Sequence, residues 1–400
     1  MTMKIIGQNS ENGEDFSLVL GGPLYQILRR SRLAGDALEL ALQRTITLSL
    51  FAWLPLLLLS ALKGQTLRGD IQIPFLLDVE VHIKFLVVVP LLIISELVVH
   101  SRMRLVVKQF LERHLIPEKD LPRFYGAVAS AFRLRNSVLA EVLLVAFVYG
   151  VGVLIIWRHY TALATATWYA IPTAEGMKIS LSGTWYGYVS LPLFQFLLIR
   201  WYFRMFIWAR FLWQVSRLDL KLVPTHPDRV GGLGFMSNTV YAFAPLAAAH
   251  GGMLAGFVAN RIFYRGASLP EFKMEIAVIV LFLLCVILGP LVLFSPRLAA
   301  AKRSGGREYG SLAMRYVREF DNKWLRGGAP ADEALVGSAD IQSLADLSNS
   351  FEVVRTMRIT PITRDAIVQL SAAALLPVAP LALTLMPLEE LLKRLLGVVF

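Results

Sequence analysis

Residues 274–294 read MEIAVIVLFLLCVILGPLVLF and contain a single charged side chain, Glu275. A helix needs about 20 predominantly apolar residues to cross a bilayer core of about 30 Å, so this stretch is long enough to span a membrane. Residues 45–62, TITLSLFAWLPLLLLSAL, form a second run of the same kind. Because a bilayer core offers no water to backbone polar groups, such segments are expected to be helical.

The composition of the whole chain agrees with this interpretation. Hydrophobic residues make up 56% of the 400 residues and charged residues 17%, whereas soluble proteins carry about 25% charged residues. The sequence therefore predicts an all-α fold, a polytopic membrane helix bundle of about seven spans. The predicted spans are 45–62, 84–100, 138–157, 185–207, 239–262, 274–295 and 366–386.

The distribution of basic residues predicts the orientation of the bundle. About three quarters of the lysines and arginines lie in the N-terminal arm and in the connections 101–137, 200–237 and 296–365. Basic connections stay in the cytoplasm, so the N-terminus is expected there. The net charge of +11 is then explained by the basic connections on the cytoplasmic side, and a nucleic-acid partner is not needed to account for it. The predicted partners are the lipid bilayer and the anionic lipid headgroups of its cytoplasmic face.

Four regions follow from this pattern. They are an N-terminal arm with an interfacial helix (1–44), a six-span bundle (45–295), a cytoplasmic helical region (296–365), and a seventh span, kinked or re-entrant, with an amphipathic tail helix (366–400). The stretches 23–33, 307–325 and 340–358 have apolar residues at helical spacing. These helices are expected to lie on the membrane or to dock under the bundle.

Several ionisable residues lie within the predicted spans. Glu96 and Glu141 are near the cytoplasmic ends of two spans, and Arg200 and Arg204 lie at a similar depth in a third. An unpaired carboxylate at that depth is costly, so the sequence predicts a buried acid–base cluster. Its role is either functional or that of a structural ion-pair lock. The arginines of the fourth span, Arg200, Arg204, Arg210 and Arg217, are either snorkelling residues of an interfacial helix end or the basic wall of an anion path or a headgroup pocket. His250 lies in the middle of the fifth span, where a packed, hydrogen-bonded histidine and a proton relay are both open.

The fifth span also carries small residues at every fourth position. Two parallel rows are present: Ala244, Ala248, Gly252 and Gly256, and Ala247, Gly251, Ala255 and Ala259. Such rows let helix backbones approach closely in lipid. This helix is therefore predicted to be central or to form an oligomer contact, which leaves a homo-oligomer open.

Three residues on the opposite face carry oxygen and nitrogen atoms of the kind that bind divalent cations. Asp78, Glu80 and His82 would share one side of an extended strand. A solvated rim is the simpler interpretation of these three residues. The single cysteine, Cys285, excludes an internal disulfide and a cysteine-rich metal centre, and neither a metal site nor a cofactor is predicted.

The connection THPDRVGGLGF, residues 225–235, links the fourth and fifth spans. Its glycines permit a tight turn, and a helix N-terminus beside a basic residue suits an anion. The candidate residues for an anion or lipid-headgroup site are His226, Asp228, Arg229, Gly231 and Gly232. The spacing matches neither a dinucleotide-binding motif nor a P-loop. A structural turn, a headgroup site and an acid–base pair remain as alternatives.

The order of these pieces resembles a group of uncharacterised bacterial inner-membrane proteins of similar length. The resemblance is carried by WYGYVSLPLFQFLLIRWYFRMFIWARFLWQVSR (185–217), THPDRVGGLGF and DIQSLADLSNSFEVVRTMR (340–358). It implies a bacterial inner membrane and no particular activity. Three functions stay open: a channel or transporter-like protein for a small anion or ion, a membrane enzyme acting on lipid headgroups, and a non-catalytic scaffold or sensor.

Overall fold

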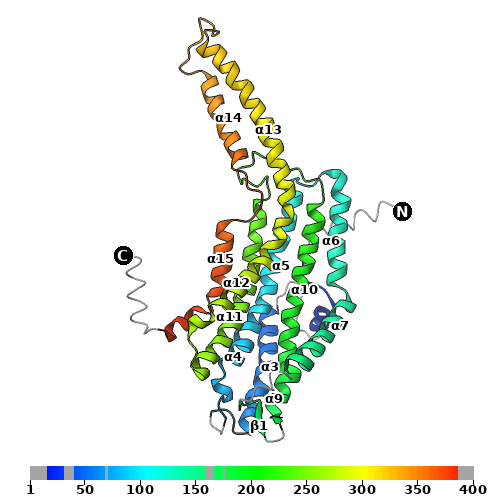
Figure 1. Ribbon diagram of the computed structural model, residues 1–400. Helices are drawn as coiled ribbons and strands as arrows, with labels where there is room; N and C mark the ends of the chain where they lie inside the picture. Colours follow the sequence, from blue (N-terminus) through cyan, green and yellow to red (C-terminus); the bar gives the residue numbers. More distant parts are fainter. Residues whose placement is uncertain (1–15, 31–39, 68–70, 158–165, 174–175, 386–400) are drawn as a thin grey trace, which may run out of the picture.

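The computed structural model describes residues 16–30, 40–67, 71–157, 166–173 and 176–385. Its long helices run side by side in a bundle, with a short β-hairpin at one end and a projecting pair of helices at the other (Figure 1). The predicted all-α class is confirmed, apart from that β-hairpin. The predicted tail helix after residue 386 lies outside the described residues.

The elements follow one another along the chain with short connections. The α-helices are α2 (Pro23–Arg30), α3 (Ala41–Leu62), α4 (Val79–Ile83), α5 (Val89–Glu112), α6 (Leu121–Arg135), α7 (Val138–Phe147), α9 (Leu181–Trp185), α10 (Leu191–Ser216), α11 (Thr239–Arg265), α12 (Lys273–Leu288), α13 (Ser295–Phe320), α14 (Ala339–Arg355) and α15 (Arg364–Leu375).

Shorter helical turns connect many of these helices. The 3-10 turns are η1 (Phe75–Leu77), η3 (Glu118–Asp120), η6 (Gly234–Asn238), η7 (Leu269–Phe272), η8 (Gly289–Phe294) and η10 (Ala379–Thr384). The π-helical turns are η2 (Lys84–Val88), η4 (Val148–Trp157), η5 (Tyr186–Ser190) and η9 (Asp321–Leu325).

Four helical stretches in the described part of the chain are long and apolar enough to cross a membrane: Ala41–Leu62, Val79–Glu112, Gly234–Arg265 and Leu269–Leu325. A fifth is added if the bent pair Glu118–Arg135 and Val138–Leu154 counts as one span. Such helices are what an integral membrane protein requires. The predicted count of about seven spans is not confirmed.

The predicted span 138–157 lies in the bent pair, and two other predicted spans are absent from these stretches. The segment 185–207 lies in a continuous helical stretch from α9 to α10, but its arginines and other polar residues make it less apolar than the four. The segment 366–386 is broken, because α15 ends at Leu375 and a 3-10 turn follows around Pro380. At about 1.5 Å per residue, α15 alone is too short to cross a bilayer.

The second predicted span begins earlier than expected. The helical stretch starts at Val79, where the Asp78 side chain accepts a hydrogen bond of 3.2 Å from the Val81 N–H and caps α4. The strand assumed for Asp78, Glu80 and His82 is therefore wrong, because these residues form a helix start. Among the described residues, no group of three or more His, Cys, Asp or Glu side chains could hold a metal ion.

Helix α11 lies at the centre of the bundle and packs against α5, α4 and α15. Its small residues permit this. A Cβ at Gly252 would lie 3.1 Å from Val88, and a Cβ at Gly251 would fall on the backbone carbonyl of Ala374. The small-residue rows thus contact helices of the same chain, which satisfies the prediction of a central helix.

The helices expected around 307–325 and 340–358 are present in α13, η9 and α14. They form an antiparallel helical hairpin that projects away from the bundle (Figure 1). Near the far end of the hairpin, the Asp340 carboxylate accepts hydrogen bonds from the Lys323 ammonium at 2.7 Å and from the Trp324 indole at 3.0 Å. The helical hairpin is therefore not docked under the bundle, and several of its apolar side chains, among them Leu312, Val317 and Ile341, are exposed. That these helices lie on the membrane stays a prediction.

The β-hairpin closes the opposite end of the bundle. Strand β1 (Ala170–Thr173) pairs antiparallel with β2 (Gly176–Ile179). Trp168, just before β1, is fully buried and donates its indole N–H to Asp78 at 2.8 Å. This bond ties the β-hairpin to the start of α4, next to the cavity described below.

Candidate functional site

A charged cluster lies inside the bundle, built from Arg44, Glu96, Glu141, Arg200 and Arg204. The Glu96 carboxylate is 2.5 Å from the Arg44 guanidinium, 2.7 Å from that of Arg204 and 3.5 Å from that of Arg200. Arg200 also lies 3.3 Å from Glu141. The exposed fraction of each of these side chains is 11% or less, so the ion pairs are shielded from water.

Four helices supply these residues, and local bonds hold them in register. Glu141 lies in the first turn of α7 and accepts the Leu24 N–H at 2.7 Å. On α10, the Trp201 indole donates to the Leu92 carbonyl of α5 at 2.9 Å. The Arg204 guanidinium lies 4.8 Å from the centre of the Trp201 ring. The cluster therefore joins α3, α5, α7 and α10.

The structure brings together the four residues Glu96, Glu141, Arg200 and Arg204. It adds Arg44, which sequence reasoning placed in the N-terminal arm. The missed signal is helical spacing: Arg44, Ala52, Leu56 and Ser60 all lie on the buried side of α3. Since Arg200 and Arg204 are paired with carboxylates, they do not form the open basic wall of an anion path.

His250 lies apart from the charged cluster. Its Nε2 is 2.6 Å from the Tyr202 hydroxyl, and its Nδ1 is 2.8 Å from the Leu246 carbonyl one helical turn earlier. Both ring nitrogens are thus occupied within α10 and α11. This arrangement is that of a packed, hydrogen-bonded histidine rather than a proton relay.

The connection 225–235 is organised around the Asp228 carboxylate. It accepts hydrogen bonds from the N–H groups of Val230 (2.9 Å), Gly232 (3.2 Å) and Gly234 (2.8 Å). Partial burial raises the pKa of Asp228, but these three bonds and the nearby His226 outweigh that effect and hold the pKa below its usual value. The N–H groups that an external anion would need are already used.

The same connection anchors the helical hairpin. The Arg358 side chain donates to the Asp228 carbonyl at 3.2 Å, and its N–H donates to the Arg229 carbonyl at 2.7 Å. Arg229 has a positive φ of 56° and Gly231 one of 66°, which a tight turn requires. This connection, with His226, Asp228, Arg229, Gly231 and Gly232, therefore forms a tight turn that binds the base of the helical hairpin.

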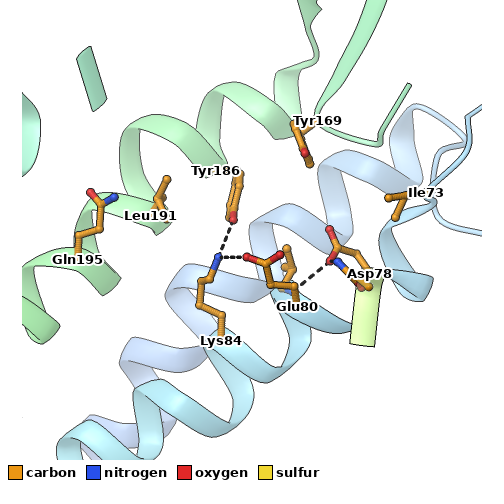
Figure 2. A pocket seen from close by; sticks show the side chains of 10 residues that line it. Ile73, Asp78, Glu80, Lys84, Tyr169, Tyr186, Leu191 and Gln195 are labelled. Carbon is orange, nitrogen blue, oxygen red and sulfur yellow. Dashed lines mark hydrogen bonds and ion pairs between the residues drawn. The ribbon is translucent and has the colours of Figure 1, made fainter. Parts of the chain in front are cut away.

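A polar pocket of about 200 Å³ lies nearer the β-hairpin end (Figure 2). It is lined by Ile73, Asp78, Glu80, Val81, Lys84, Tyr169, Tyr186, Leu191, Gln195 and Asn260. The Lys84 ammonium is 3.0 Å from the Glu80 carboxylate and 3.1 Å from the Tyr186 hydroxyl. Sequence reasoning noticed Asp78 and Glu80 but did not connect them with the other elements that close this pocket.

A second cavity of about 240 Å³ adjoins the polar pocket and shares Ile73, Glu80, Tyr169 and Asn260 with it. Its remaining lining includes Arg261 and Arg265 near the end of α11. The two cavities are therefore neighbours at the β-hairpin end of the bundle. Comparison of the chain with family models, curated proteins and solved structures gave no match.

Proposed function

We propose that this chain is an integral membrane protein of the transporter type, which takes a small solute into the polar pocket and releases it on the opposite side of the membrane. The observation that carries this proposal is the pocket itself, a cavity with charges of both signs among apolar helices. Ionisable residues are expensive inside a membrane and commonly mark a solute or ion path.

The charged cluster then serves as the closed barrier of the path. Lys84 of the polar pocket and Glu96 of the cluster lie on the same helical stretch, Val79–Glu112, about 18 Å apart at 1.5 Å per residue. Gln195 and Arg200 repeat this order on α10. Release of the solute past the cluster would require the pairs of Glu96 with its arginines to separate.

Location and orientation belong to the same proposal. We place the protein in a bacterial inner membrane, in the group that its sequence resembles, with the N-terminus and the helical hairpin in the cytoplasm. The polar pocket then opens toward the outside. Anionic headgroups of the cytoplasmic leaflet would surround the base of the helical hairpin, and self-association of the chain stays a prediction.

A substrate-independent experiment tests transport. Gln195→Cys is introduced into a chain whose native Cys285 is replaced by alanine. Right-side-out and inside-out vesicles are then treated with a membrane-impermeant maleimide. A transporter exposes the pocket to each side in turn, so we expect Cys labelling in both preparations. Single cysteines on the helical hairpin and the β-hairpin serve as controls of vesicle orientation. Labelling from one side only would contradict the proposal.

One observation favours a second candidate, a ligand sensor that recruits a partner. The helical hairpin extends well beyond the bundle (Figure 1), and its base is bonded to the connection 225–235 through Arg358. Lys302 on α13 adds a bond of 2.7 Å to the Met357 carbonyl. If the pocket cysteine reacts only from the β-hairpin side, the sensor is the better description.

A further inference from the structure

We propose that the polar pocket binds a small organic cation through its ammonium group. The inference rests on the proposed function for the role of the pocket and deepens it by naming the class of ligand. It departs from the anion expected from the arginine-rich fourth span. Four features of the pocket lead to it: size, charge, unfilled acceptors and aromatic faces.

The size of the polar pocket suits a small molecule. The polar pocket measures about 200 Å³, while one water molecule accounts for about 30 Å³ of liquid. The adjoining cavity shares four of its lining residues. A ligand of several non-hydrogen atoms can therefore enter, with one end reaching the Glu80 carboxylate.

The charge of the polar pocket itself favours a cation. Two of its carboxylates, Asp78 and Glu80, face one ammonium, that of Lys84, while Arg261 and Arg265 line only the adjoining cavity. The oxygens of Asp78 are occupied by the Val81 N–H, the Asn260 amide and the Trp168 indole. Glu80 differs, because Lys84 bonds to one of its oxygens and no described group donates to the other. One carboxylate oxygen is thus free to receive a ligand.

The unfilled hydrogen-bond positions are acceptors. The Asn260 Oδ1 and the Gln195 Oε1 are buried and receive no hydrogen bond within the described part of the chain. The orientation of the Asn260 amide is fixed, because its Nδ2 donates to Asp78 at 2.8 Å. Since a buried acceptor without a donor costs free energy, a ligand that donates to these oxygens would gain affinity. An ammonium N–H group is such a donor.

Aromatic faces supply the remaining attraction. The Tyr169 and Tyr186 rings lie 5.8 Å apart and both line the polar pocket. The Lys84 ammonium is already 5.7 Å from the centre of the Tyr186 ring. The face of an aromatic ring attracts a cation electrostatically, whereas it offers no such attraction to a carboxylate. A ligand anion would in addition meet Glu80 directly.

Binding is tested with three probes of similar size: n-butylamine, butyramide and butyrate. The purified full-length chain is heated in detergent at pH 7, and salt is added so that the ionic strength is equal in all samples. We expect n-butylamine to raise the unfolding temperature in a saturable way, and the amide and the carboxylate to leave it unchanged. Protection by butyrate that equals or exceeds that of the amine would overturn the proposal.

Two glutamine variants then locate the binding. Gln195→Leu removes an oxygen that has no partner in the folded chain, so the variant is expected to fold. It should weaken the affinity for n-butylamine by about tenfold or more, since a hydrogen bond to a charged group is lost. The control Gln109→Leu removes a buried, unpartnered oxygen from α5 outside the pocket lining. Equal affinity in both variants would place the amine elsewhere.

The two experiments fail independently of each other. Amine binding with cysteine labelling from one side only would keep the cation site and reject transport. Labelling from both sides without amine protection would keep transport and reject the cation.

Discussion

Replacing Glu96 by glutamine is the sharpest test of the charged cluster. The substitution keeps the shape of the side chain but leaves the guanidinium groups of Arg44, Arg200 and Arg204 with Glu141 as their only described carboxylate. Removing one partner of a buried ion pair costs about 3–5 kcal/mol. Because Glu96 contacts three arginines, we expect Glu96→Gln to lie at the upper end of this range.

The measurement is the free energy of unfolding of the purified full-length chain in mixed micelles, followed by tryptophan fluorescence. Glu141→Gln should cost less, about 1–3 kcal/mol, since Glu141 contacts one arginine and one backbone N–H. Glu352→Gln removes an exposed pair with Arg355 and should cause no measurable change. If Glu96→Gln were as stable as Glu352→Gln, the cluster would not hold the bundle together and the reasoning would fail.

Three further perturbations follow from other parts of the molecule. Gly251→Ala should destabilise the bundle by about 1–3 kcal/mol, since the new methyl group meets the backbone of α15. The control Gly126→Ala, which faces open space on α6, should be neutral or slightly stabilising in the same unfolding assay. The pKa of Asp228 lies below its usual value, so its contribution to stability is complete above about pH 4 and is lost as the pH falls through the lower folded pKa. In Asp228→Asn this acid-dependent loss should be absent from unfolding temperatures measured between about pH 6 and pH 3. Finally, cysteines at Val336 and Lys178, in a chain without the native cysteine, should react with an impermeant reagent from opposite sides of the membrane, and reaction from one common side would refute the proposed orientation.

The sequence predicted part of the charged cluster because span boundaries set the depth of each residue. Glu96, Glu141, Arg200 and Arg204 fall at similar depths in three apolar segments, and their costly burial required pairing. Arg44 escaped notice because it immediately precedes an apolar run. Hydropathy alone places the start of the span after Arg44, although α3 begins at Ala41. The spacing of the buried residues along α3 includes Arg44 and would have placed it in the helix.

The polar pocket could not be predicted in the same way. Its lining comes from the start of α4, the segment before β1, the turn between α9 and α10, and the end of α11. Only the packing of α11 against α4 brings Asn260 to Asp78. Local periodicity contains no information on which distant helices become neighbours.

The helical hairpin illustrates a different limit. Its two helices and the break between them followed from apolar spacing and from the glycines of the intervening stretch. The direction of the hairpin did not follow, because an amphipathic pattern is the same for a helix on a membrane surface and for one that packs on another helix.

The continuous helix from Leu269 to Leu325 has a mechanical consequence. Its distal part starts near Lys302, which is bonded to the Met357 carbonyl at the base of the helical hairpin, and extends to Leu325 over about 36 Å at 1.5 Å per residue. A rigid rod of that length converts a tilt of about 10° at its base into a displacement of about 6 Å at its tip. A small tilt among the apolar helices would therefore move the tip of the helical hairpin by about the length of a side chain, through leverage alone.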